Sequence, residues 1–321
     1  MLNTYEKKLL GFLVGIIILG TALFGSEFLS MKTLLIMANQ LPEYGLISIA
    51  LMITLIVAGM NLSIVSMTTL AGIIGALTMH YFEGLGSFSV VIGIIVMLSV
   101  GALTGAINGA VVSFLEVSPI VTTLGTMMLF KGVALNITQG GAIRSFHPFF
   151  TYIGNGKILG MPFPLFVFIV VAIIVGWILS SSDFGKQLYR IGKNKEAAIY
   201  SGINVKKVIF MAYILAGIVA GITAMVMTAR YNSIRVDYGE AYLLNGLVIV
   251  SLGGIDINGG KGTMKGMLIA VTIISVMLRI LNLAYMDSHL MSAIMGVILL
   301  VNIFIQHYSN QRMKRKIEKE I

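Results

Sequence analysis

The sequence predicts an all-α integral membrane protein with about ten transmembrane helices, and three observations support this prediction. Of the 321 residues, 57% are hydrophobic and only 11% are charged, whereas soluble domains are about half apolar and a quarter charged. The apolar residues form runs close to the roughly 20 residues that a helix needs to cross a bilayer. The basic residues gather in alternate connections between these runs, as expected when Lys and Arg remain in the cytoplasm.

Ten apolar runs mark the predicted spans. They cover residues 9–25, 40–59, 63–81, 88–114, 119–138, 163–181, 208–229, 241–254, 264–284 and 289–306. An even number of spans that starts inside places both termini in the cytoplasm, with a basic tail at 307–321. On this assignment fifteen of the 22 Lys and Arg residues lie inside, five lie outside and two fall within spans. The threefold bias agrees with the rule for membrane topology, and residues 1–321 are predicted to form one domain in the cell (inner) membrane.

Composition also excludes several kinds of chemistry. The chain has no cysteine, so disulfides, thiolate metal sites and cysteine nucleophiles are ruled out. Its net charge of +9 is explained by basic loops at the lipid surface, and no nucleic-acid partner is expected. No Asp or Glu lies in the middle third of a predicted span, which argues against a proton relay. We therefore predict no enzyme activity, no metal and no cofactor.

Small residues recur four apart in the fourth predicted span, at Gly101, Gly105 and Gly109. This spacing lets two helix backbones approach closely in lipid, so the three glycines predict a helix–helix contact. The alternative is that the same face lines a transport path.

A second pattern, AGMNLSIVSMTTLAG (58–72), follows the second span. Gly59 permits the helix to break, and Asn61 or Ser63 can cap a new helix that begins close to the membrane interior. Broken helices at this depth are tolerated where they line a cavity, so the pattern is a candidate for a transport path. An ordinary tight turn between two spans is the alternative.

A third pattern is the one long polar stretch in the middle of the chain, DFGKQLYRIGKNKEAAIYSGINVKK, which we term the central polar segment (183–207). It contains six basic residues. Residues 196–201 are predicted to form a short amphipathic helix that Asn194 caps and Gly202 ends. A short helix of this kind between two spans indicates a docking partner, although any cytoplasmic loop carries basic residues.

Two further stretches resemble functional sites less closely. In the glycine-rich stretch 251–266, Ile255 and Gly262 occupy the positions where a phosphate-binding loop needs Gly and Ser or Thr. We therefore expect a turn between two spans and no nucleotide site. Lys131 lies within the apolar run of the fifth span, where a charge either reaches the membrane surface or serves a function.

Four stretches, in order along the chain, resemble the bacterial ABC permeases for ribose, xylose, galactose and related sugars. They are GMNLSIVS (59–66), PIVTTLGTM (119–127), YRIGKNKEAAIYSGINVKKV (189–208) and LGGIDINGGKG (252–262). The chain departs from the family pattern at two positions, because Asn61 replaces the usual aspartate and Val65 the usual glycine.

The resemblance implies an inner-membrane subunit that hydrolyses no ATP itself. It implies three protein partners: a cytoplasmic ATP-binding subunit, a second permease that is the same or a related chain, and an extracytoplasmic solute-binding protein. The residues expected to couple to the ATPase are Gly192, Asn194, Glu196, Ala197 and Gly202. Ala197 and Ala198 are both expected to be small because the partner surface lies against them.

A selective path for polyols needs hydroxyl and amide groups rather than fixed charges. The residues expected to line it are Asn61, Ser63, Thr126 and Asn245. The function expected is therefore import of a neutral sugar or sugar-like solute. The alternatives are a stand-alone secondary carrier, a nucleoside or autoinducer permease of the same family, and a membrane scaffold with no transport role.

Overall fold

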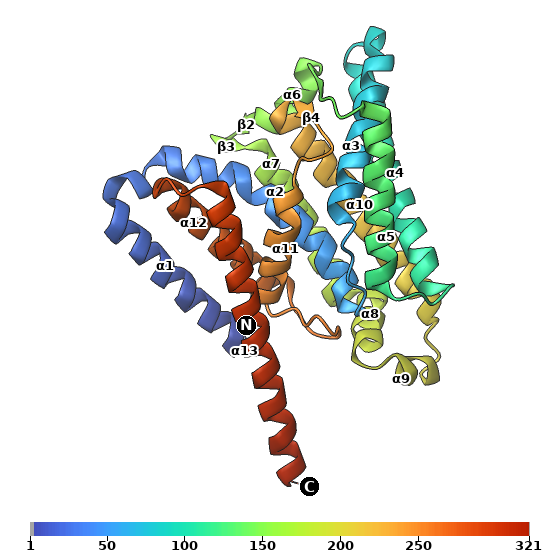
Figure 1. Ribbon diagram of the computed structural model, residues 1–321, viewed down its shortest axis with the longest axis vertical. Coiled ribbons are helices and arrows are strands. Elements are labelled where there is room, and N and C mark those ends of the chain that lie inside the picture. The colour runs from blue at the N-terminus through green and yellow to red at the C-terminus, as the bar shows by residue number, and fades with distance from the viewer. Residues whose placement is uncertain (1–2, 321) are drawn as a thin grey trace.

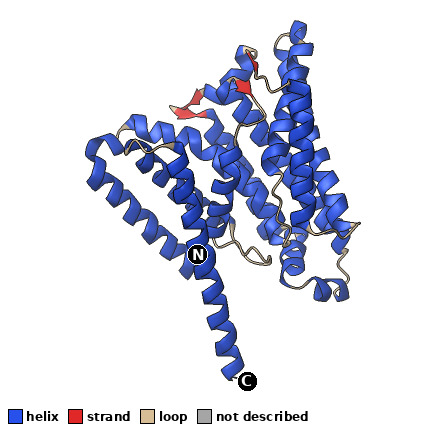
Figure 2. Cartoon of the chain, viewed as in Figure 1, coloured by secondary structure: helices blue, strands red, loops and turns tan. Residues whose placement is uncertain are grey.

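The computed structural model describes residues 3–320, with side chains as far as residue 304. Most of the described chain is helical, as Figure 2 shows. Among the described residues, eight helices are long and apolar enough to span a membrane. They are α1 (Thr4–Phe28), α2 (Met31–Ile56), α3 (Ile64–Tyr81), α4 (Ser87–Ser113), α5 (Pro119–Thr138), α7 (Phe163–Ser181), α10 (Val205–Tyr231) and α12 (Met264–Leu283). The all-helical membrane fold is confirmed.

The other two predicted spans form shorter apolar helices. They correspond to α11 (Glu240–Leu252) and to the first part of α13 (Ser288–Glu320), whose apolar portion ends at Phe304. Eight of the ten predicted spans therefore have the length and composition of a membrane span, and the count of ten stays a prediction. The side chains of the predicted basic tail, 307–321, lie outside the described residues.

The short elements lie at the two ends of the helical bundle (Figure 1). One end has two antiparallel strand pairs, β1 with β4 and β2 with β3, together with α6. The opposite end has α8 and α9, and the C-terminus points the same way. The bounds are η1 (Glu83–Leu85), β1 (Ile143–Arg144), α6 (Pro148–Asn155), β2 (Lys157–Ile158), β3 (Met161–Pro162), α8 (Asp183–Lys193), α9 (Lys195–Tyr200) and β4 (Ser233–Ile234).

The helix α10 occupies the centre of the bundle and packs against α2, α3 and α4. Its contact with α4 is made through glycines, as the sequence predicts. A Cβ atom built on Gly101 would overlap the carbonyl oxygen of Gly217, and one on Gly105 would overlap that of Tyr213. The two backbones therefore touch directly, which leaves this face of α4 no room to line a path.

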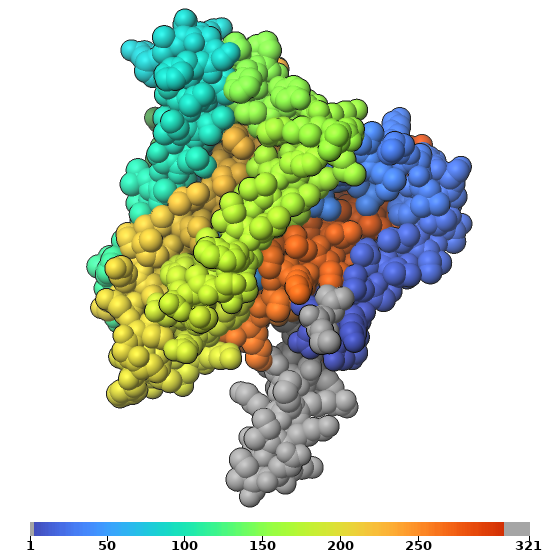
Figure 3. Space-filling view, turned by 180° about the vertical axis from the view of Figure 1, so that it is seen from behind, coloured from blue at the N-terminus to red at the C-terminus, as the bar shows by residue number. Residues whose placement is uncertain are grey.

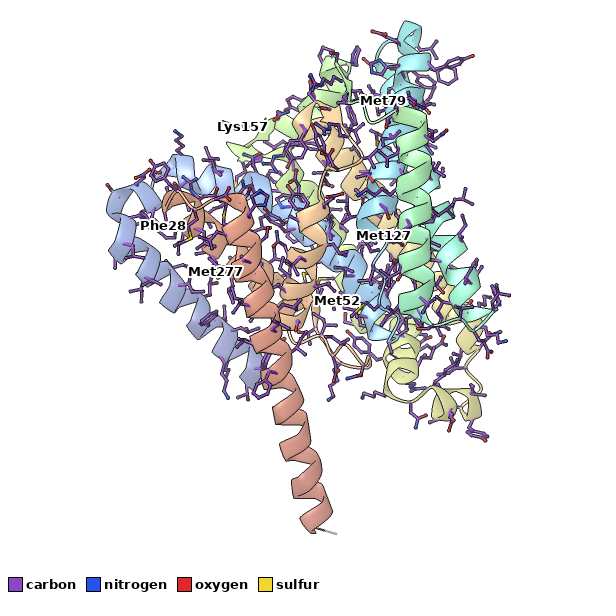
Figure 4. The ribbon with its side chains drawn as sticks, in the orientation of Figure 1. Phe28, Met52, Met79, Met127, Lys157 and Met277 are labelled. Atoms are coloured by element: carbon purple, nitrogen blue, oxygen red, sulfur yellow. The ribbon has the colours of Figure 1, made fainter. Side chains whose placement is uncertain are left out.

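The helix α1 lies at the periphery and packs mainly against α12. Phe28, labelled in Figure 4, forms a small buried cluster with Val276, Ile280 and Leu283 of α12. At the other end of α1, the Tyr5 hydroxyl donates to the carbonyl of Leu252. Most of the other α1 side chains are exposed, which suits a helix with one face against α12 and the rest surrounded by lipid.

We expect Gly217→Leu to prevent stable folding, because its side chain would occupy the space filled by the α4 backbone. Inserting methylenes into a well-packed contact costs about 1–3 kcal/mol, and backbone gives way less than side chains do. The measurement is the yield of monodisperse protein after extraction in mild detergent. Gly15→Leu is the matched control, since nothing lies within 4 Å of a Cβ at that position of α1. Equal yields from the two variants would contradict the close contact of α4 and α10.

Candidate functional site

The chain breaks between α2 and α3 at the predicted place. The helix α2 ends at Ile56, and Ala58 adopts a left-handed backbone with φ of 58°. The prediction assigned the break to Gly59. Glycine is required at that position for a different reason, because a Cβ atom there would lie 2.9 Å from the Tyr213 hydroxyl. Ser63 occupies the N-cap position of α3, but its side chain makes no capping hydrogen bond.

The Asn61 side chain stabilises the break and begins a network of buried polar groups. Its Oδ1 accepts hydrogen bonds from the Ser63 backbone at 3.0 Å and from the Ser63 hydroxyl at 2.7 Å. Asn108 of α4 donates from Nδ2 to that hydroxyl at 2.7 Å and accepts at Oδ1 from the Thr126 hydroxyl of α5 at 2.6 Å. Hydrogen bonds therefore join three of the four predicted path residues, Asn61, Ser63 and Thr126. The link between Ser63 and Thr126 is Asn108, which the sequence analysis missed.

Two further buried polar residues, Thr123 and Asn245, differ in how they relate to this network. Thr123 of α5 accepts a hydrogen bond from the backbone of Leu62 and donates to the carbonyl of Met60, so α5 is tied to the break itself. Asn245 is buried on α11, and within the described residues no hydrogen bond joins its side chain to the network. The assignment of Asn245 to the path therefore stays a prediction.

The helix in the central polar segment forms almost as predicted. The helix α9 covers Lys195–Tyr200, and the Asn194 side chain caps it by accepting a hydrogen bond from the Ala197 backbone at 3.0 Å. Gly202 has φ of +78°, a left-handed conformation in which a side chain would be strained. The preceding helix, α8, was not predicted.

The exposed face of α9 differs in one respect from the expectation. Ala197 is exposed, but Ala198 is only 3% exposed and packs against the rest of this chain. The expectation that both alanines face a partner is therefore wrong for Ala198, which is small because its own protein covers it. Ile199 and Tyr200 are 53% and 91% exposed, so α9 presents large apolar groups away from the bundle.

Three segments that are distant in sequence meet at one point, which we term the glycine junction (Ile56, Gly192 and Gly260). The Gly260 backbone donates to the Ile56 carbonyl, the last residue of α2, at 2.8 Å. A Cβ on Gly192 of α8 would overlap both that carbonyl oxygen and the Gly260 nitrogen. The end of α2, the central polar segment and the glycine-rich turn are therefore in backbone contact.

A hydrogen bond from α8 fixes the glycine-rich turn beside this junction. The Tyr189 hydroxyl donates to the carbonyl of Gly262 at 2.9 Å. Burial raises the pKa of Tyr189 to about 12, so the hydroxyl keeps its proton near neutral pH and remains a donor. The turn thus packs against α8 as a structural element, as its sequence indicated.

A buried carboxylate near the other end of the bundle was missed by the sequence analysis. Glu43 is fully buried in the middle of α2, with its Oε1 2.8 Å from Nη1 of Arg230. Its Oε2 accepts hydrogen bonds from the hydroxyls of Tyr231 and Tyr242 at 3.0 and 2.7 Å. The prediction that no carboxylate lies in the middle third of a span is therefore wrong.

The error arose because the second span was assumed to start at residue 40. The helix α2 begins at Met31, where the Ser30 side chain caps it by accepting from the Thr33 backbone. Serine before an apolar run is an N-cap signal that the sequence already contained. A second charge within an apolar run, Lys131, pairs with Glu240 at the surface of the structure.

We expect Glu43→Gln to lower the stability of the protein strongly, because it leaves the Arg230 charge buried without its counterion. Removing one partner of a buried ion pair costs about 3–5 kcal/mol, while an exposed pair contributes at most about 1 kcal/mol. Thermal unfolding in detergent should show a shift of several degrees for Glu43→Gln and little for Glu240→Gln, which breaks the exposed pair with Lys131. Similar shifts would mean that the buried pair contributes no more than a surface one.

Comparison with known proteins places these features in a family. Residues 33–303 match the model described as "Branched-chain amino acid transport system / permease component". The ribose import permease protein RbsC of Haemophilus influenzae is 29% identical over 297 residues, which cover 91% of this chain and 90% of the relative. RbsC of Bacillus subtilis is 30% identical and covers 90% of this chain and 89% of the relative. The autoinducer 2 import system permease protein LsrD of Salmonella typhimurium is 30% identical, over 88% of this chain and 86% of its own. No solved structure matches.

Proposed function

Because the chain belongs to the family of branched-chain amino acid transport system permease components, we propose that it is the membrane subunit of an ATP-driven importer for a neutral sugar or sugar-like solute. Membership makes it a transport permease and a multi-pass membrane protein of the cell membrane. The substrate class is supported by the relatives, whose names give import of ribose and of autoinducer 2. The first of these is a neutral sugar.

The observation that carries this proposal is the glycine junction. In the proposed transport cycle a cytoplasmic ATPase binds the exposed face of α9, near Ala197 and Glu196. Movement of the central polar segment then reaches the end of α2 through the backbone contacts of Gly192, with no flexible side chain in between. The break that follows α2 holds Asn61 and Ser63, so the partner's ATP cycle is coupled to the proposed path.

The chemistry of the path supports an uncharged substrate. The side chains that meet there are amides and hydroxyls, on Asn61, Ser63, Asn108 and Thr126. These groups hydrogen-bond to one another in the structure, and separation of α4 and α5 from the break would release them to bind hydroxyl groups of a solute. We further propose that a second permease chain and an extracytoplasmic binding protein complete the importer.

Transport in proteoliposomes tests the proposal. The permease is reconstituted with the ATPase and the binding protein of its own system, and uptake of labelled ribose is followed. Uptake that requires ATP on the ATPase side supports the proposal, and competition by nucleosides or autoinducer 2 distinguishes the substrate alternatives within the family. Solute uptake by the permease alone, driven by a proton gradient, would refute it.

The second candidate function, a stand-alone secondary carrier, is favoured by one observation. Glu43 is a buried ionisable group within a span, and carriers use such groups as proton relays. Its ion pair with Arg230 and two tyrosine hydroxyls also explains it as a structural group. Collapse of the proton gradient should leave uptake unchanged in the importer and abolish it in the carrier.

The orientation of the chain is tested by cysteine labelling, which has no background because the chain lacks cysteine. We expect a cysteine at Ser201 to react with an impermeant maleimide only from the cytoplasmic side, and one at Asn155 only from outside. Both positions are exposed and lie at opposite ends of the bundle. The reverse pattern, or equal labelling of both, would contradict cytoplasmic termini and the even number of spans.

A further inference from the structure

A large groove on the surface of the helical bundle has no role in the proposed transport path. It lies between α7, α8, the start of α12 and the start of α1, and its volume is about 910 Å³. Figure 3 shows this face, with α7 and α8 in lime beside α12 in orange. None of the predicted path or coupling residues lines the groove. Its walls are of two kinds, apolar along α7 and basic beside α8.

The apolar wall has the depth of one bilayer leaflet. Along α7 the groove extends from Phe168 to Leu179. Eleven helical steps of about 1.5 Å each give roughly 16 Å, which is about half of the roughly 30 Å hydrocarbon layer. Gly176 lies within this wall, and a Cβ there would be 3.3 Å from Met264 of α12. The absence of a side chain at Gly176 therefore keeps the groove open where the two helices approach.

The basic end lies where α7 gives way to α8. Four basic side chains line it: Lys186, Arg190, Lys193 and Lys265. Lys186 pairs with Asp183, whereas the other three form no salt bridge within the described residues. The one acidic residue in the lining, Glu6, is buried and accepts hydrogen bonds from the Asn3 backbone and the Thr263 hydroxyl. Lys265 is close enough to Glu6 to interact with its charge, so the groove joins an apolar wall to an end where four basic residues outnumber one acidic residue.

We propose that the groove binds one anionic phospholipid from the leaflet on the α8 side. Its phosphate lies among Arg190, Lys193 and Lys265, and an acyl chain lies along α7. A zwitterionic lipid would fill the same apolar wall but bring no net charge to the basic end, and a soluble phosphate compound would leave the wall uncovered. Each basic residue near the headgroup favours an anionic lipid by about fivefold. The proposal concerns lipid binding alone and does not depend on the transported solute.

The only tryptophan of the chain does not line this groove but lies beside it, one helical turn of α7 from Ile173 in the lining. Trp177 is next to Gly176 on α7 and is 64% exposed. The purified full-length permease is reconstituted into phosphatidylcholine vesicles with a small mole fraction of brominated phosphatidylglycerol or of brominated phosphatidylcholine. Bromine quenches tryptophan fluorescence on contact. We expect the brominated anionic lipid to quench Trp177 at least about fivefold more effectively than the zwitterionic one at equal mole fraction, since even one of the three basic residues gives about that preference.

Variants separate specific binding from general surface charge. The pair Arg190→Glu and Lys265→Glu should abolish the preference for the anionic lipid. The control pair Lys195→Glu and Lys207→Glu makes the same change of charge. Both control residues lie in the central polar segment but outside the groove lining, so this pair should retain the preference for the anionic lipid. Gly176→Leu changes no charge but places a side chain in the groove where an acyl chain would lie, so it should also abolish the preference for the anionic lipid.

Two results would overturn the proposal. Equal quenching by the two lipids in the unchanged protein would mean that the groove selects no headgroup or is covered by protein. Equal loss of preference in the test and control pairs would mean that overall charge, rather than the groove, attracts the lipid. Monodisperse elution of each variant in detergent shows that it is folded before it is reconstituted.

Discussion

Gly192→Ala is expected to lower ATP-driven uptake by roughly tenfold to a hundredfold while the permease still inserts into the membrane. The added Cβ would overlap the Ile56 carbonyl oxygen and the Gly260 nitrogen, so the glycine junction must separate. Overpacking costs about 1–3 kcal/mol, and 1.4 kcal/mol corresponds to a factor of ten. Because the overlap is with backbone rather than with a flexible side chain, the upper part of this range applies. Uptake of the labelled solute in cells measures the effect.

The control for this prediction is Gly15→Ala, which makes the same chemical change where no atom lies within 4 Å. We expect normal uptake from the control and equal amounts of both variants in the membrane. Gly192→Ala should also reduce the coupling of ATP hydrolysis to solute, so that the ATPase of the complex no longer responds to the loaded binding protein. Normal uptake by Gly192→Ala would show that the junction transmits nothing.

Ala197→Trp is expected to abolish uptake without reducing the amount of folded permease. Ala197 is exposed on α9 and is flanked by the exposed side chains of Ile199 and Tyr200. A bulky side chain there disturbs a docked partner and touches nothing inside the chain. Co-purification of the ATPase, measured beside uptake, should be lost together with transport.

Two variants control for the size and place of this change. Ala197→Ser keeps the side chain small and should transport normally. Ala198→Trp places the same bulk one residue further on, where the position is 3% exposed, and should instead lower the yield of folded protein. If Ala197→Trp retains both transport and the ATPase, the central polar segment is an ordinary solvated loop, and the secondary carrier becomes the better account.

Local signals in the sequence were sufficient to predict much of this structure. Runs of apolar residues predicted the long helices, because a helix in lipid must be both apolar and continuous. The short helix α9 was predicted to within one residue at each end, since Asn194 and Gly202 are strong start and stop signals. The spacing of Gly101, Gly105 and Gly109 predicted that α4 makes a close helix–helix contact, although it did not identify α10 as the partner.

Features that depend on distant partners could not be predicted in the same way. Asn108 has no neighbour in sequence that marks it as polar and buried beside Ser63, 45 residues earlier in the chain. The burial of Ala198 and the exposure of Ala197 depend on how α9 is rotated against the bundle, which two adjacent alanines do not reveal. The glycine junction joins three segments that are distant in sequence. The need for glycine there is visible only in the structure, where their backbones are in contact.

The peripheral position of α1 has a consequence for the order of events during synthesis. The hydrogen bond from the Thr263 hydroxyl to Glu6 joins residues 257 positions apart. At about 5–20 residues per second, a ribosome needs on the order of 10–50 s to add that length. During this time α1 has no α12 to pack against and must persist in the bilayer without this partner, which its long apolar run allows. The helix α1 is therefore inserted well before its final partner has been made.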